Sequence, residues 1–159
     1  MLPGYTYHLT HRCVNKEFLL RYRQERNTYR KWLREGVKRH EVVLYGYCVT
    51  ANHVHLITRV DSTESVAAMV QLAAGATARA YNRRKDRSGA FWAEQYHCTA
   101  VEEKDHLWRC LRYVDLNMVR AGEVEHPRDW QWCGYEELVG IRQRYRMLSV
   151  DDLLEGLGG

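Results

Sequence analysis

Apolar and polar positions alternate with a period of about two in parts of this 159-residue chain. Residues 5–14 are rich in β-branched and aromatic side chains, and residues 96–101 form another strand-like run. Two stronger runs, residues 41–49 and 53–60, are separated only by residues 50–52. Such runs are typical of β-strands, and the short separation predicts a hairpin. The pattern therefore predicts four strands.

Three longer segments have helical spacing instead. Apolar side chains recur at helical intervals between about residues 17 and 40, in an alanine-rich stretch after residue 62, and between residue 106 and about residue 121. This spacing predicts an amphipathic helix in each segment. Residues 82–89 are expected to form a basic loop, and Gly122 is a natural stop for the last helix. The expected N-caps are Asn15, then Asp61 or Ser62, and then Asp105.

The expected order of elements is βαββαβα, followed by a short helix near the C-terminal end. With antiparallel neighbours, this order is typical of an α+β protein, a ferredoxin/RRM-like sandwich in which helices pack on an antiparallel sheet. A chain of this length forms one domain by default, and no linker composition interrupts it. We therefore expect a single domain over residues 1–159, with a core of about residues 5–135 and a tail of about residues 136–159.

Composition narrows the class of protein. Hydrophobic residues make up 45% and charged residues 28% of the chain, as in ordinary globular proteins. No apolar run approaches the roughly 20 residues that cross a bilayer, and the first residues lack a signal-peptide pattern. The five cysteines are widely spaced without a CxxC pair, which favours reduced thiols over a disulfide framework or a zinc knuckle. These features predict a cytoplasmic protein with no membrane segment.

The net charge of +4 is unevenly distributed. Basic side chains crowd residues 21–39, and a second basic run follows the middle helix. Cations with nearby aromatic rings suit a nucleic-acid surface, because the cations neutralise phosphates and the rings stack on unpaired bases. Solvated helix faces are the alternative explanation for each cluster. The DNA contacts expected from the second run are Arg83, Arg84, Lys85 and Arg87.

The tripeptide His53-Val54-His55 lies within one of the two strong strands. Side chains alternate faces along a strand, so both imidazoles project from one side, about 7 Å apart along the chain. Two imidazoles in this arrangement can chelate one divalent cation from a rigid element. Two ordinary polar-face residues are the alternative. His8 and His11 are three apart on the first strand and face opposite sides, so they cannot form a second pair of this kind.

The last long helix carries a second polar set. At roughly 100° per residue, Tyr113, Asn117 and Arg120 share a stripe that is separate from the apolar stripe. An edge aromatic, a surface amide and a cation favoured at a helix C-terminus are the alternative explanation. Together with the histidines, the stripe fits phosphodiester chemistry, because a tyrosine can attack a phosphodiester that a divalent cation polarises. Asn117 would then be a third metal ligand, and Arg120 would contact a phosphate.

At this point the sequence resembles a known family. Residues 52–57, Asn-His-Val-His-Leu-Ile, resemble the HUH motif of the IS200-like tyrosine transposases. Residues 113–124 are similar to that superfamily's Tyr-Ile-x-x-Asn-Pro-Val-Arg-Ala-Gly-Leu-Val segment. Residues 89–97 resemble its Gly-x-Phe-Trp-x-x-x-Tyr-His stretch, and residues 130–135 resemble its Tyr-x-Trp-Ser-Ser-Tyr. The resemblance covers about residues 5–135, and the branch it resembles most is the REP-associated tyrosine transposases, named for repetitive extragenic palindromes.

The resemblance implies a metal-dependent single-stranded DNA endonuclease and strand transferase that cleaves near hairpins such as REP-like palindromes. It implies that Tyr113 is the nucleophile, which forms a 5′-phosphotyrosine and frees a 3′-hydroxyl. His53, His55 and Asn117 would hold Mg²⁺ or Mn²⁺. Relatives include monomers and dimers with shared active sites, so both a monomer and a homodimer stay open for this chain.

Three departures from the family pattern bear on these expectations. Met118 replaces the proline that usually follows the asparagine, so the helix is expected to run straight where relatives bend. Thr50-Ala51 stands where Met-Pro is common, and the region between the first strand and the first helix is shorter than in many relatives. Since no reacting group is missing, an active enzyme is favoured over a catalytically silent DNA-hairpin-binding module derived from such a transposase. A zinc-dependent hydrolase would need a third His, Asp or Glu ligand and a general base near the pair, which the sequence does not supply.

Overall fold

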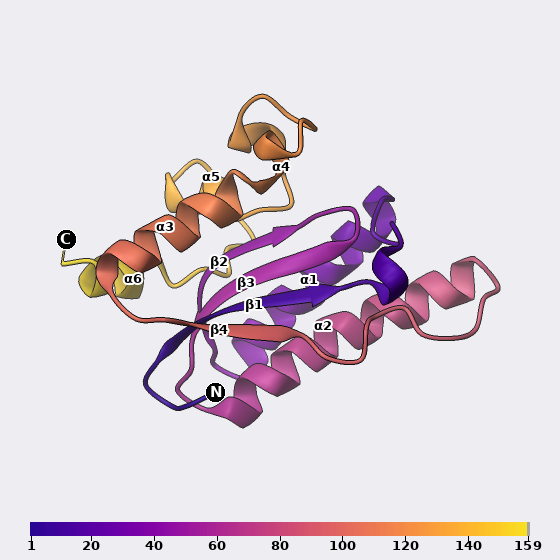
Figure 1. Ribbon diagram of the computed structural model, residues 1–159, viewed down its shortest axis with the longest axis horizontal. Coiled ribbons are helices and arrows are strands. Elements are labelled where there is room, and N and C mark those ends of the chain that lie inside the picture. The colour runs from indigo at the N-terminus through magenta and orange to yellow at the C-terminus, as the bar shows by residue number, and fades with distance from the viewer. Residues whose placement is uncertain (159) are drawn as a thin grey trace.

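The computed structural model describes residues 1–158 and contains a four-stranded antiparallel sheet with helices on both faces (Figure 1). The strands are β1 Thr6–Arg12, β2 Val43–Val49, β3 His53–Arg59 and β4 His97–Val101. The helices are α1 Arg23–Arg39, α2 Thr63–Arg84, α3 Lys104–Asp115, α4 Asn117–Arg120, α5 Tyr135–Leu138 and α6 Val150–Gly156, with 3₁₀ turns at Val14–Lys16 and Pro127–Asp129. The strand order β2-β3-β1-β4, with every neighbouring pair antiparallel, confirms the predicted ferredoxin-like α+β sandwich.

Alternation along β3 divides the core into two layers. Val54 and Leu56 are buried on one face of the sheet, together with apolar side chains of α1 and α2. Ile57 is buried on the other face, in a cluster with Leu111 of α3. Figure 1 shows α1 and α2 on one side of the sheet and α3 on the other. Because the two histidines of β3 share the parity of Ile57, both imidazoles face the α3 layer.

The central hairpin and the start of α2 follow the sequence pattern. β2 and β3 pair as predicted, and Ser62 is the N-cap of α2, where its Oγ accepts from the Ser65 N–H at 3.2 Å. α2 is longer than predicted, because residues 82–84 are helical and the basic loop begins only after them. The Arg84 guanidinium pairs with Glu25 of α1 at 2.6 Å, which helps to hold this last turn in place.

The first long helix begins at Arg23 rather than near residue 17. The prediction of Asn15 as its N-cap is wrong, because Asn15 lies in a 3₁₀ turn with a φ of 52°. The residues before α1 bond to a distant segment instead, and the buried Leu20 donates its N–H to the Ala51 carbonyl in the β2–β3 turn at 2.9 Å. Tertiary contacts of this kind outweigh the local helix propensity.

The last long helix begins earlier than predicted and is interrupted. α3 begins at Lys104, with Glu103 in the N-cap position, so the prediction of Asp105 as the cap is wrong. Leu116, with φ −93° and ψ 5°, separates α3 from α4. The prediction of a straight helix is therefore wrong as well, and the interruption occurs without a proline. Met118 is buried in the core beneath α3, so packing of this side chain contributes to the direction of the last turn.

Gly122 ends α4 as predicted and has a φ of +77°. The Glu123 N–H donates to the Met118 carbonyl and the Gly122 N–H donates to the Val119 carbonyl, both at 3.0 Å, as in a Schellman cap. Because a Cβ is strained at this φ, we expect Gly122→Ala to lower the free energy of unfolding by about 1 kcal/mol. Urea titration measures this change. Gly156→Ala is the control, since Gly156 has no positive φ and open space at its Cβ position, and an equal loss in both variants would contradict the prediction.

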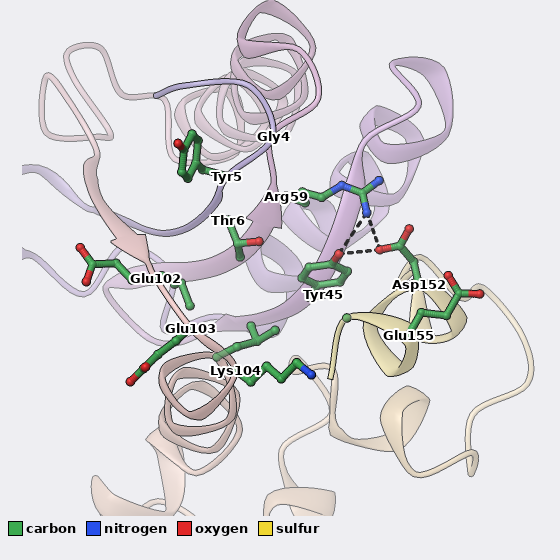
Figure 2. Close-up of a pocket in the computed structure, with 13 residues that line it drawn as sticks. Gly4, Tyr5, Thr6, Tyr45, Arg59, Glu102, Glu103, Lys104, Asp152 and Glu155 are labelled. Carbon is green, nitrogen blue, oxygen red and sulfur yellow. Dashed lines mark hydrogen bonds and ion pairs between the residues drawn. The ribbon is translucent and has the colours of Figure 1, made fainter. Parts of the chain in front are cut away.

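The C-terminal segment covers the free edge of β2. The Ser149 N–H donates to the Leu44 carbonyl at 2.8 Å. Figure 2 shows how α6 is attached, with Asp152 accepting from the Tyr45 hydroxyl and from the Arg59 guanidinium. The described part of the predicted tail therefore packs onto the sheet. The hollow in Figure 2, of about 540 Å³, contains none of the predicted site residues.

Two further observations bear on the expectations from composition. The five cysteines are free thiols, as expected for a chain without a disulfide framework. Across residues 1–158, no helix is long and apolar enough to cross a membrane.

Candidate active site

The two histidines of β3 converge at one point on the α3 side of the sheet. The Nε2 atoms of His53 and His55 lie 3.0 Å apart, and the two rings are nearly perpendicular, with an interplanar angle of 89°. The side-chain nitrogen of Asn117, Nδ2, lies 3.2 Å from His55 Nε2. The structure thus brings together the three residues that the sequence predicts as metal ligands.

Asn52 sets the protonation of His53. The His53 Nδ1 atom lies 2.7 Å from Asn52 Oδ1 and 3.0 Å from Thr50 Oγ1. An amide oxygen only accepts hydrogen bonds, so the hydrogen of the neutral imidazole is on Nδ1 and the lone pair is on Nε2. Burial, and to a smaller degree the Arg12 cation, lowers the pKa of His53 to about 4, so the ring is neutral at pH 7. The lone pair of Nε2 therefore points to the convergence point.

His55 is held from the neighbouring strand. Its Nδ1 atom lies 2.9 Å from His8 Nε2 and 3.3 Å from Thr10 Oγ1, and both partners belong to β1. The side chain is 3% exposed, and burial, followed by the neighbouring His53 and His8, lowers its pKa to about 2. With its ring hydrogen on Nδ1, His55 would face His53 lone pair to lone pair at 3.0 Å, and a cation between the two rings would relieve that repulsion.

The donor set fits an octahedral divalent cation. Two ligands at right angles on such an ion, each about 2.1 Å from it, lie about 3.0 Å apart. The 3.0 Å separation of His53 and His55 matches this geometry. Half a turn of the Asn117 amide presents Oδ1 in place of Nδ2. Within residues 1–158, no group of three His, Cys, Asp or Glu side chains could hold a metal, so the third protein ligand would be this amide.

Tyr113 stands beside the convergence point on the exposed side of α3. Its ring centroid is 5.7 Å from that of His55 in an edge-on contact, and the residue is 48% exposed. An adjoining hollow of about 420 Å³ is bordered by Tyr113 and by side chains of β1, including His8 and Arg12. The phenol therefore combines access from solvent with proximity to His55.

Arg120 contacts Tyr113 directly. Its Nη2 donates to the Tyr113 carbonyl at 2.6 Å, and its Cζ lies 4.0 Å from the centroid of the tyrosine ring. This cation–π contact orients the ring and places a positive charge next to the phenol. The phosphate contact expected of Arg120 stays a prediction, and the structure adds its contact with Tyr113.

His8 belongs to the site but was not among the predicted site residues. The structure confirms that the two histidines of β1 face opposite sides, because His8 contacts His55 whereas His11 stacks on Trp92 with the ring centroids 4.4 Å apart. The sequence alone did not place His8 at the site because it does not give the register between β1 and β3. In the structure this register sets Thr10 opposite His55, so the face of β1 that carries Thr10 and His8 lies at the site. A register is a relation between strands, which spacing along one strand does not contain.

The basic run that the sequence predicts for DNA contacts lies in another layer. Arg83 and Lys85 are exposed at the C-terminal end of α2, across the sheet from α3 (Figure 1). Arg84 pairs with Glu25 at 2.6 Å, and Arg87 donates to a backbone carbonyl of the following loop. The structure does not bring this run to the histidines and the tyrosine.

A second cationic surface forms between α1 and the C-terminal segment, and we call it the α1 groove. It is a hollow of about 460 Å³ whose walls include Gln131 and Tyr145. Tyr145 is 68% exposed, and the Arg34 Cζ lies 5.2 Å from the centroid of its ring. The sequence reveals the cations of α1 but not the groove, because its second wall comes from residues 131–147. The cations that line it are Arg23, Arg30, Lys31, Arg34 and Arg142.

Comparison with known proteins gives the family of this chain. The sequence matches the family described as "Transposase IS200 like" over residues 2–117. The chain belongs to the IS200-like transposase family. The matched range includes the β3 histidines, Tyr113 and Asn117. Membership assigns a transposase-like function to this IS200-like chain.

One solved structure shares the fold of this IS200-like chain. The chain is similar to a REP-associated tyrosine transposase bound to a REP hairpin, with a TM-score of 0.68 and 15% sequence identity, over 94% of this chain and 88% of the other. A crystal structure described as a transposase from Deinococcus radiodurans R1 is 17% identical, with a TM-score of 0.47, over 69% of this chain and 88% of the other. A search of curated proteins found no match. At 15% identity, the first likeness establishes the fold.

Proposed function

We propose that this protein is a metal-dependent single-stranded DNA endonuclease and strand transferase that cleaves near hairpins through a phosphotyrosine at Tyr113. The observation that carries the proposal is the convergence of His53, His55 and Asn117 at one point beside the exposed Tyr113 ring. The nucleophile comes from α3 and the neutral cation ligands come from β3 and α4. They meet at an open surface, where a phosphodiester of an incoming DNA strand can reach both.

Tyr113 attacks the phosphorus of the scissile phosphodiester through its Oη atom. The phenolic proton passes to water, the Oη–P bond forms, the P–O3′ bond breaks and the departing O3′ takes a proton from water, which leaves a 5′-phosphotyrosine and a 3′-hydroxyl. A 3′-hydroxyl then attacks the same phosphorus and gives its proton to water; the new P–O3′ bond joins the strand, the P–Oη bond breaks, and Oη takes a proton from water, which restores Tyr113. Arg120, 4.0 Å from the ring centroid, holds the phenol in place, and its charge offsets the negative charge that develops there.

His53, His55 and Asn117 would hold Mg²⁺ or Mn²⁺. When bound, such a cation polarises the scissile phosphate and offsets its developing charge. The contribution of the chain is to keep both imidazoles neutral and oriented. Burial lowers their pKa values to about 4 and about 2, and Asn52 accepts the ring hydrogen of His53.

The proposed substrate is single-stranded DNA that contains a hairpin. A REP-associated transposase of the same fold is bound to a REP hairpin. In this chain the α1 groove offers five cations against one carboxylate, Glu35, on a concave surface, and this excess of positive charge suits the phosphate backbone of a hairpin stem. The hollow beside Tyr113 is open to a single strand.

Incubation of the full chain with labelled hairpin DNA and Mg²⁺ or Mn²⁺ tests the proposal. We expect a covalent protein–DNA adduct that survives denaturing electrophoresis and does not form when EDTA removes the cation. Hairpin binding without an adduct, in the presence of either cation, would contradict the enzyme and leave the hairpin-binding module.

Charge removal tests which cationic surface holds the hairpin. We expect Lys31→Gln combined with Arg34→Gln to weaken binding and to reduce the slope of log K against log salt by about 2, because each phosphate contact releases about one counterion. The matched pair, Arg83→Gln with Lys85→Gln, removes the same charge from the predicted basic run. Fluorescence anisotropy at several salt concentrations measures both pairs. An unchanged slope for the first pair would exclude the α1 groove, and a reduced slope for the second would assign phosphate contacts to α2.

A further inference from the structure

His8 lies where β1 meets the strand that carries the proposed metal ligands. Antiparallel pairing sets Thr10 opposite His55, and His8 is two residues earlier on the same face of β1. The His8 Nε2 atom is 2.9 Å from His55 Nδ1, whereas Thr10 Oγ1 is 3.3 Å from it. His8 is therefore the nearer of the two polar partners of that ring nitrogen.

Each ring nitrogen of His55 has a polar neighbour. With the ring hydrogen on Nδ1, His55 Nε2 accepts from Asn117 Nδ2 at 3.2 Å in the metal-free protein and presents its lone pair towards His53. A buried N–H requires an acceptor, and the ring is 3% exposed. His8 Nε2 supplies that acceptor at 2.9 Å, which leaves the His8 hydrogen on its own Nδ1.

We propose that His8 is a positioning residue that fixes the tautomer and the orientation of His55, so that the His55 lone pair points towards His53. The use of this lone pair as a metal ligand rests on the proposed function. Ligating histidines usually give their second N–H to a carboxylate, a backbone carbonyl or water. In this chain the imidazole of His8 is the acceptor instead, and its hydrogen bond connects His55 to β1.

Two substitutions separate hydrogen bonding from packing. His8→Leu keeps a side chain of moderate size but removes the hydrogen-bond acceptor, whereas His8→Gln supplies an acceptor oxygen. We expect His8→Leu to weaken Mn²⁺ binding by roughly 10- to 100-fold, as loss of a supporting partner of a metal ligand does, and His8→Gln to recover most of that affinity. His11→Gln is the control on the same strand, because His11 faces the opposite side and stacks on Trp92.

Nitrogen-15 NMR of the metal-free protein, recorded at one neutral pH, shows which nitrogen of His55 carries the hydrogen. We expect the Nδ1–H tautomer in the wild-type, His8→Gln and His11→Gln proteins, and a mixture of tautomers in His8→Leu. A wild-type His55 with its hydrogen on Nε2, or a His8→Leu spectrum that keeps the wild-type tautomer, would overturn the proposal. A Mn²⁺ titration of the same samples separates the two claims. If the wild-type protein binds no Mn²⁺, the proposed metal site fails, while the tautomer comparison still decides the role of His8.

Discussion

Tyr113→Phe is expected to abolish the covalent protein–DNA adduct while leaving hairpin binding nearly unchanged. The substitution removes only Oη, and the ring keeps its contacts with His55 and Arg120. Because Tyr113 is 48% exposed, losing one hydroxyl leaves no buried polar group without a partner. Removal of a catalytic nucleophile typically costs about 10⁴- to 10⁶-fold in rate. Denaturing electrophoresis of labelled hairpin DNA with Mn²⁺ measures the adduct, and anisotropy under native conditions measures binding.

Tyr5→Phe is the matched control for this experiment. Tyr5 is 58% exposed and borders the hollow of Figure 2, away from the histidines. We expect it to form the adduct at the wild-type rate. An adduct that persists at this rate in Tyr113→Phe would assign the nucleophile to another residue and would contradict the proposed chemistry.

The sheet could be predicted because one-sided burial imposes a period of two on each strand. In β3, Val54 and Leu56 join one core layer and Ile57 joins the other, as alternation requires. The same parity predicted that both histidines of this strand share a face. The order of elements then restricts the topology to few alternatives, and the ferredoxin-like arrangement is the one observed.

The ends of the helices were less predictable, because distant segments determine them. Leu20 is buried and bonds to Ala51, so the chain remains irregular up to Arg23 despite its helical spacing. Leu116 interrupts the last helix although no proline is present. These outcomes depend on tertiary packing, whose free energy outweighs local helix propensity and cannot be read from a short stretch of sequence.

The candidate site divides in the same way. Tyr113 and Asn117 are four residues apart, and both approach His55 even though Leu116 lies between them. Spacing along one helix was therefore enough to predict that they share a side. His8 required the register between two strands, and the α1 groove required the fold of residues 131–147 against α1. Periodicity along the sequence does not encode such contacts between distant segments, so these residues of the site could not be predicted from it.

His53→Ala and His55→Ala are each expected to abolish cleavage in Mg²⁺ or Mn²⁺ while largely sparing hairpin binding. Each variant removes one of two imidazole nitrogens that converge to 3.0 Å, and a single remaining imidazole with an amide is a poor chelate. Loss of charge stabilisation at the phosphate should slow adduct formation by at least about 100-fold. Adduct formation and Mn²⁺ binding, measured on the same samples, should fall together.

His53→Ala is the cleaner of the two variants, because His55 is 3% exposed and its truncation also leaves a cavity in the sheet–α3 layer. Thermal unfolding of each variant separates lost stability from lost chemistry. His40→Ala is the control, since His40 ends α1 in the other layer and should change neither cleavage nor Mn²⁺ binding. If His53→Ala lost hairpin binding as completely as cleavage, the pair would be structural. If it lost cleavage alone, the convergence of the two imidazoles would serve the reaction, because binding of the DNA hairpin by the α1 groove would be unchanged.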